Sequence, residues 1–199
     1  MNFYQIFLPS FTLIYVLQIF VFRSWLQWRK TGINPFVFGK TETAHDYIGR
    51  VYKVMMVGTW VAIICSSFIP DVYHYLMPIG YLDNQFIQLS GLVLLVTSFI
   101  WIVVAQYQMS KSWRIGINYE EKTDLVSHGV FAYSRNPVFL GVLVSYLGTF
   151  LIIPNALTFA TLWITYFIIQ VQVRLEEEYL KSIHGDAYEL YQRKTHRWL

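Results

Sequence analysis

The chain has 199 residues, of which 55% are hydrophobic and 19% aromatic, and its formal net charge is +3. Only 14% of the residues are charged, whereas soluble domains average about 25%. This composition excludes an ordinary soluble domain, and the length fits one membrane domain over residues 1–199. The single cysteine, Cys65, excludes an internal disulfide and a cluster of thiolate ligands, and we expect no metal site.

Five apolar runs that contain no Asp, Glu, Lys or Arg predict five membrane-spanning helices. The runs cover residues 1–22, 54–70, 86–107, 137–153 and 156–173. A span needs about 20 apolar residues, and roughly 17 is the lower limit. The expected fold class is therefore an all-α integral membrane protein, with three N-terminal spans in residues 1–107 and two more in residues 108–199.

The lysines and arginines are confined to alternate connections between these runs and to the segment after the last run, which predicts the orientation of the chain. The other two connections contain no Lys or Arg, and their charged residues are Asp71 and Asp83. Because Lys and Arg resist translocation, we expect the N-terminus outside and the C-terminus in the cytoplasm. Basic residues that face an anionic leaflet also explain the net charge, so no nucleic-acid partner is expected. The fifteen are Arg23, Arg29, Lys30, Lys40, Arg50 and Lys53, then Lys111, Arg114, Lys122 and Arg135, then Arg174, Lys181, Arg193, Lys194 and Arg197.

The connection between the first two runs, residues 31–49, carries Gly32, Pro35 and Gly39 and is predicted to be irregular. His45 and Asp46 are interpreted as solvated residues of this loop. They are too isolated in the sequence to indicate a site.

The last two apolar runs form a stretch of 38 residues, 136–173, without a charge. Pro154 and Asn155 lie near its middle, where proline disfavours helix continuation and asparagine favours a turn. The sequence therefore predicts a tight hairpin of spans four and five. Such a hairpin would bring the segment that ends at Arg135 next to the segment that begins at Arg174.

Beyond the hairpin, apolar residues recur at intervals of three and four, which predicts a C-terminal amphipathic helix on the membrane surface or over the hairpin. The residues that define this pattern are Tyr179, Ile183, Ala187, Leu190 and Tyr191.

Two motifs flank the predicted hairpin. The first is Gly129-x-Phe131-x-x-x-Arg135-Asn136-Pro137-x-Phe139-x-Gly141. The second is Glu176-Glu177-x-x-Leu180-x-x-x-x-Gly185-x-x-Tyr188-x-x-Tyr191. Together they resemble the isoprenylcysteine carboxyl methyltransferase family, within the wider group that includes phospholipid methyltransferases. The resemblance covers residues 112–191, whereas the first half of the chain matches only as a set of spans.

Three positions depart from the common pattern of that family. Asn136 stands where relatives have histidine, Phe139 where they have tyrosine, and Thr123 where some have histidine. The departures indicate a bacterial-type branch, and hence a multi-pass protein of a bacterial inner membrane.

The resemblance implies S-adenosylmethionine as methyl donor and a lipophilic acceptor, either a small molecule or a lipidated substrate, that enters sideways from the membrane lipids. A prenylcysteine-like carboxylate is the expected acceptor. Arg135 and Glu177 are the expected catalytic residues, and Arg135, Phe139 and Leu143 the expected acceptor contacts. The expected donor-binding residues are Thr123, Leu125, Val126, His128, Gly129, Phe131, Asn136, Pro137, Glu176 and Glu177.

Elementary chemistry is compatible with these roles. A glutamate can accept a hydrogen bond from an amino group or a ribose, and the fork of Arg135 can pair with a carboxylate. An acceptor carboxylate needs no base, so catalysis would consist of alignment, desolvation and charge placement. Arg135 could instead only mark the membrane interface, and the glutamates could only begin a solvated helix.

Three other functions stay open. A phospholipid methyltransferase, or one that acts on a small amine or thiol, would need Glu177 or a tyrosine as base. A non-catalytic membrane protein could keep the same fold. A sterol-reductase-like enzyme with a nicotinamide cofactor is disfavoured by the small number of spans.

Overall fold

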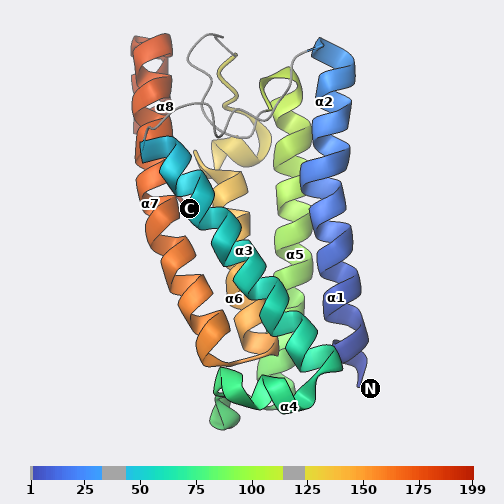
Figure 1. Ribbon diagram of the computed structural model, residues 1–199. Helices are drawn as coiled ribbons and strands as arrows, with labels where there is room; N and C mark the ends of the chain where they lie inside the picture. The colour runs from blue at the N-terminus through green and yellow to red at the C-terminus, as the bar shows by residue number, and fades with distance from the viewer. Residues whose placement is uncertain (1, 33–43, 114–123) are drawn as a thin grey trace.

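The computed structural model describes residues 2–32, 44–113 and 124–199, and the regular structure in these ranges is helical (Figure 1). Within them, four helical stretches are long and apolar enough to cross a membrane: Phe3–Thr31, Ala44–Phe68, Gln85–Met109 and Ala156–His184. The apolar helix α6 (Pro137–Ile152) has 16 residues, about 24 Å at 1.5 Å per residue. A hydrocarbon core is about 30 Å thick, so α6 is shorter than a full span.

The first span is longer than predicted because Arg23 is accommodated inside the bundle. Helix α1 (Phe3–Val16) continues through a π-helical turn, Leu17–Phe22, into α2 (Arg23–Thr31). Buried Arg23 donates to the carbonyl oxygens of Gln106, at 3.0 and 3.2 Å, and Ser110, at 2.6 Å. These carbonyls belong to the end of α5 (Gln85–Met109), where the helix leaves acceptors unpaired. The first helical stretch therefore continues past Arg23 instead of ending there.

The second span, α3 (Ala44–Phe68), begins earlier than the sequence predicts. The interpretation of His45 and Asp46 as solvated loop residues is wrong, because both are buried in the first turn of this helix. His45 Nδ1 lies 2.9 Å from Gln172 Oε1 on α7 (Ala156–His184). The helix crosses the bundle obliquely, contacting α7 toward one end and α1 toward the other (Figure 1).

Helix α6 is held at the centre of the bundle by a close seam with α5. A Cβ on Gly148 would lie 2.8 Å from the Gly91 carbonyl oxygen, so only glycine permits this approach. The hydroxyl oxygens of Ser98 and Ser145 lie 2.8 Å apart across the same seam. Small residues and short polar contacts of this kind drive helix association in membranes. The seam fixes the position of α6, and with it the motif residues at its N-terminus.

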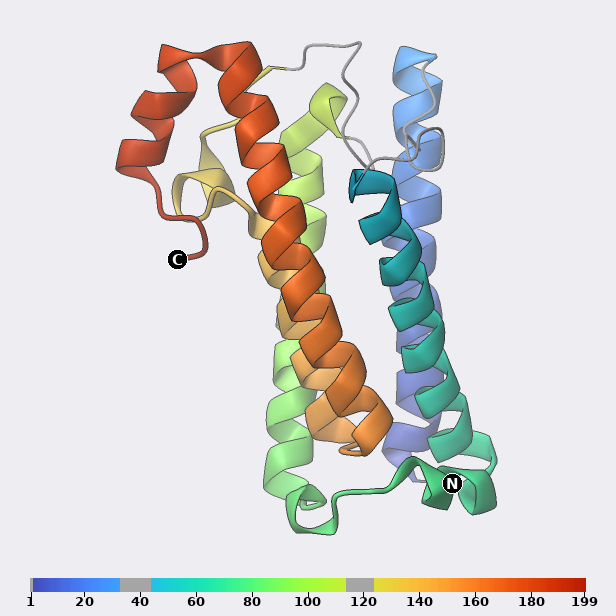
Figure 2. The same ribbon diagram turned by 60° about the vertical axis from the view of Figure 1, so that its left-hand side comes forward.

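Helices α6 and α7 run antiparallel and are joined by Ile153, Pro154 and Asn155 alone (Figures 1 and 2). The Asn155 side chain caps α7 by accepting from the Thr158 backbone at 3.0 Å. The Ile79 backbone donates to the Pro154 carbonyl at 2.9 Å, so the connection between α3 and α5 covers this turn.

The C-terminal region is two helices, which corrects the amphipathic pattern predicted for it. Helix α7 extends to His184, the chain reverses at Gly185 with φ of 52°, and α8 (Asp186–Lys194) folds back beside α7 (Figure 2). The inner face of α8 consists of buried Tyr188 and Tyr191, while Leu190 is 56% exposed. Because the break resets the helical phase, the spacing across residues 179–191 does not describe one face.

Candidate functional site

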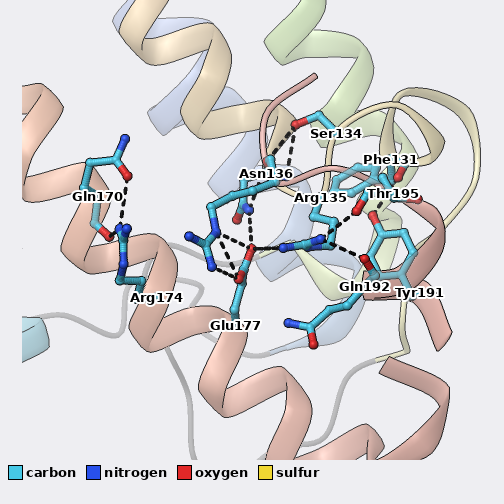
Figure 3. Close-up of polar contacts among 11 residues, drawn as sticks. Phe131, Ser134, Arg135, Asn136, Gln170, Arg174, Glu177, Tyr191, Gln192 and Thr195 are labelled. Atoms are coloured by element: carbon cyan, nitrogen blue, oxygen red, sulfur yellow. Dashed lines mark hydrogen bonds and ion pairs between the residues drawn. The ribbon is translucent and has the colours of Figure 1, made fainter. Parts of the chain in front are cut away.

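A buried carboxylate, Glu177 of α7, lies at the centre of the polar residues beside the N-terminus of α6 (Figure 3). Its Oε1 accepts from Arg135 Nη2 at 3.2 Å and from Asn136 Nδ2 at 3.0 Å. Its Oε2 accepts from Arg197 Nη2 at 2.8 Å. The two segments that flank the predicted hairpin therefore meet, as a tight turn between α6 and α7 predicts, and the C-terminal segment joins them.

Arg135 is built into the structure through most of its donors. Its Nη1 donates to the carbonyls of Gln192, at 3.2 Å, and Thr195, at 2.6 Å, and its Nε donates to Glu177 (Figure 3). Its side chain is 10% exposed. Arg135 is not the membrane-interface side chain considered above, because it ties α7 and the C-terminal segment to the entrance of α6.

The C-terminal segment pairs with the loop before α6 like a short strand. Ser134 and His196 form a parallel bridge, and the Arg135 backbone donates to the His196 carbonyl at 3.0 Å. Ser134 Oγ donates to the Arg197 carbonyl at 3.3 Å, and Asn136 Nδ2 donates to the same oxygen at 3.3 Å. This pairing positions the side chain of Arg197 against Glu177.

Sequence reasoning did not identify Arg197 as a site residue. It lies outside both motifs and is separated from Glu177 by the reversal at Gly185. Its side chain is 35% exposed, and its hydrogen bond to Glu177 raises the pKa of the guanidinium above its usual value. With two guanidiniums around one carboxylate, the cluster of Arg135, Glu177 and Arg197 has a net charge of +1.

The loop at residues 124–131 carries several of the predicted donor-binding residues. Gly129 has φ of 62°, and a Cβ there would lie within 2.3 Å of the Gln108 side chain. Gln108 Oε1 accepts from the Val130 backbone at 2.9 Å. Leu125 and Val126 are half-buried and His128 is exposed. Thr123 lies outside the described residues.

The backbone N–H groups of Leu125, Val126, His128 and Gly129 make no hydrogen bond to any described part of the chain. Such groups are available donors for a polar ligand. This part of the loop therefore offers backbone donors that no described residue uses.

Both tyrosines on the inner face of α8 stay protonated near neutral pH. Burial raises the pKa of Tyr191 to about 12. Burial, and secondly the nearby Glu177 carboxylate, raises the pKa of Tyr188 well above its usual value. Tyr191 Oη donates to the Phe131 carbonyl at 2.6 Å, which anchors α8 on the loop before α6. Neither phenol is suited to act as a base near neutral pH.

The remaining predicted residues lie on α6 and α7. Buried Pro137 is the first residue of α6, and its carbonyl accepts from Trp101 Nε1 at 2.9 Å. Phe139 and Leu143 are half-buried on α6 and pack against a core that includes Ile102 and Val142. Glu176 is half-buried beside Glu177 on α7.

The donor set fits S-adenosylmethionine, which carries an amino group, a carboxylate and a sulfonium. The cluster supplies a partly exposed cation in Arg197, and the loop supplies backbone donors that no described residue pairs. Half-buried Glu176, which precedes Glu177 on α7, supplies a carboxylate. The residues that could hold this cofactor are therefore Arg197, Glu176 and the backbone of the loop from Leu125 to Gly129.

The fold and the site together define a helical, multi-pass membrane protein with a charged cluster at one end of the bundle. The family model for phospholipid methyltransferase matches residues 86–187, just over half of the chain. The chain therefore belongs to the phospholipid methyltransferase family. The match includes Arg135 and Glu177 but ends before Arg197.

Curated relatives carry the resemblance seen in the motifs. A probable protein-S-isoprenylcysteine O-methyltransferase of Oryza sativa subsp. indica is 29% identical over 120 residues, which are 59% of this chain and 63% of the relative. A protein-S-isoprenylcysteine O-methyltransferase of Schizosaccharomyces pombe is 35% identical over 74 residues, 36% of this chain and 30% of the relative. The chain thus spans less than two thirds of these proteins.

A solved structure shows the same fold. It is the eukaryotic intramembrane Ras methyltransferase ICMT (isoprenylcysteine carboxyl methyltransferase), solved without a monobody. Its TM-score is 0.61 at 20% identity, and the similarity covers 91% of this chain and 63% of that one. The resemblance to isoprenylcysteine carboxyl methyltransferases that the motifs predict is confirmed.

Proposed function

We propose that this protein is a membrane methyltransferase that uses S-adenosylmethionine to methylate a lipophilic acceptor, with a prenylcysteine-like carboxylate as the acceptor group. The observation that carries the proposal is the contact of Arg135 with Glu177 at 3.2 Å. It unites the two segments that the family resemblance assigns to the donor. The named activity of the relatives supports the same reaction.

S-adenosylmethionine would supply an electrophilic methyl group on its sulfonium, with a neutral thioether as the leaving group. The residues of this chain align and desolvate the reacting groups. Arg135 and Asn136 hold Glu177 in place, and the net positive charge of the cluster attracts an anionic group. Arg135 acts mainly by positioning, since four of its five N–H groups already have partners.

A carboxylate acceptor agrees with the acid–base properties of the site. An amine or thiol acceptor must lose a proton, which requires a base. Tyr188 and Tyr191 have raised pKa values. Burial acts to raise the pKa of Glu177, but hydrogen bonds from Arg197 and Asn136 and the charge of Arg135 lower it overall, so Glu177 is a weak base. A carboxylate acceptor is already a nucleophile and needs none of these groups as base.

The proposed topology has five spans, with α6 and α7 as a tight hairpin, the N-terminus outside and the C-terminus in the cytoplasm. A short α6 can span if flanking residues reach toward the interfaces or the bilayer thins locally. Residues 108–199 are the proposed methyltransferase core within one membrane domain, and residues 1–107 support it. The departures at Asn136 and Phe139 favour a bacterial inner membrane.

The acceptor enters between spans, with its head near Arg135 and its tail along Phe139 and Leu143. Lipid already solvates the tail, so recognition depends more on the head than on tail length.

A transfer assay in proteoliposomes with labelled donor tests this proposal. We expect turnover of a prenylcysteine analogue and little turnover of phosphatidylethanolamine. Phe139→Trp should lower turnover of the lipid acceptor without changing donor affinity, and Phe86→Trp, at an 80% exposed position on α5, is the matched control. Preferential labelling of phosphatidylethanolamine would contradict the proposal. Equal turnover of a tail-free acceptor by the wild type, Phe139→Trp and Phe86→Trp would also contradict it.

A further inference from the structure

Arg135 and Arg197 both contact Glu177, but they differ in how many of their N–H groups have protein acceptors. Arg135 uses Nε, both N–H groups of Nη1 and one of Nη2 on protein acceptors. Arg197 uses only Nε and one N–H of Nη2, both on Glu177. Its Nη1 has no acceptor within the described parts of the chain.

Exposure follows the same division. The Arg135 side chain is 10% exposed and that of Arg197 is 35% exposed. Glu177 fixes one edge of the Arg197 guanidinium, so the other edge is held in a defined direction. A fixed guanidinium edge with free N–H groups matches the geometry of a carboxylate.

The net charge of the cluster also favours an anionic ligand. One carboxylate balances two guanidiniums, so the cluster retains one uncompensated positive charge at a partly buried position. Such a charge is stabilised by an anionic ligand.

We propose that Arg197 is the carboxylate-binding residue of this site and that Arg135 is a positioning residue that holds Glu177 and the C-terminal segment. The inference rests on the function proposed above. Two carboxylates could occupy Arg197: that of the methionine part of the donor and that of the acceptor. Both present the same chemistry, and they differ in the experiment that detects them.

Arg197→Gln and Arg197→Lys separate binding from structure. Glutamine removes the charge and the fork. Lysine keeps the charge for pairing with Glu177, but its single ammonium cannot present a second edge. Arg193→Gln, on the exposed side of α8, removes one charge from the same region and is the matched control.

The first arm is calorimetry on the full-length protein with S-adenosylhomocysteine and its decarboxylated analogue. If Arg197 binds the donor carboxylate, Arg197→Gln lowers the affinity for S-adenosylhomocysteine by roughly ten- to a hundredfold. The affinity of the decarboxylated analogue stays the same. Arg197→Lys should give the same selective loss at an unfolding temperature near that of the wild type.

The second arm measures transfer to a prenylcysteine analogue. If Arg197 binds the acceptor carboxylate, the KM for that acceptor rises by a similar factor while the affinity for S-adenosylhomocysteine is unchanged.

The inference is overturned if both Arg197 variants keep wild-type donor affinity and KM. It is also overturned if both variants lower the affinities for S-adenosylhomocysteine and for its decarboxylated analogue equally, since an equal loss indicates a structural role alone. Failure of the wild-type protein to bind S-adenosylhomocysteine would refute the proposed function itself, whatever the variants do.

Discussion

The contact of Glu177 with Arg135 and Asn136 was predictable from the sequence, but its contact with Arg197 was not. The Arg-Asn-Pro and Glu-Glu motifs place Arg135, Asn136 and Glu177 together because a tight turn at Pro154 returns the chain. Nothing in local sequence indicates Arg197, since its approach depends on the reversal at Gly185 and on pairing of His196 with Ser134. Such long-range backbone pairing leaves no periodic signal.

Tyr191 gives the molecule a stability that depends on pH. Burial raises its pKa to about 12, against about 10 in an unfolded chain. The folded state therefore holds the proton more tightly. The stabilisation is complete below pH 10 and is lost as the pH rises from 10 to 12.

Tyr191→Phe should remove this component and the 2.6 Å hydrogen bond to Phe131. At pH 8 we expect a loss of about 1 kcal/mol in the free energy of unfolding. Between pH 9 and 11.5 the unfolding temperature should fall less steeply than in the wild type. Tyr133→Phe, at a position 69% exposed, is the control. Equal slopes for the wild type and Tyr191→Phe would exclude the assigned burial effect.

At the scale of elements, the seam between α5 and α6 sets where the motif at the start of α6 lies. A Cβ on Gly148 would lie 2.8 Å from the Gly91 carbonyl oxygen and 3.0 Å from the Leu95 backbone nitrogen. Because both neighbours are backbone atoms, relief requires the helices to move apart.

Gly148→Ala should therefore destabilise the protein by about 1–3 kcal/mol, the usual cost of overpacking. Thermal unfolding in detergent measures it. Gly80→Ala, where a Cβ would meet nothing within 4 Å, should leave the unfolding temperature unchanged. Equal stability of the two variants would show that α5 and α6 do not pack this closely.

Hydropathy predicted the existence of the helices better than their ends. Helix α1 passes Arg23 because carbonyls at the end of α5 satisfy the guanidinium, and α3 begins at Ala44 because Gln172 accompanies buried His45. Both extensions depend on partners more than 80 residues away. Window hydropathy treats such polar residues as the end of a span.

At the scale of the whole molecule, the helix ends that carry the Lys and Arg residues share one end of the bundle with the cluster (Figure 1). The opposite connection carries Asp71 and Asp83. In the proposed orientation, which follows from the positive-inside rule, the charged cluster would face the cytoplasm. A reporter fused to the C-terminal end of the chain should be active only in the cytoplasm, and its export would contradict the orientation.

We propose that the cluster around Glu177 forms the base of a methyl-donor site. Calorimetric titration of the purified protein with S-adenosylhomocysteine, with NADPH in a parallel titration, tests this proposal. We expect saturable binding of S-adenosylhomocysteine, a binding free energy weaker by about 1–3 kcal/mol in Glu177→Gln, and wild-type affinity in exposed Glu178→Gln. Saturable binding of NADPH with no response to S-adenosylhomocysteine would refute a methyl-donor site.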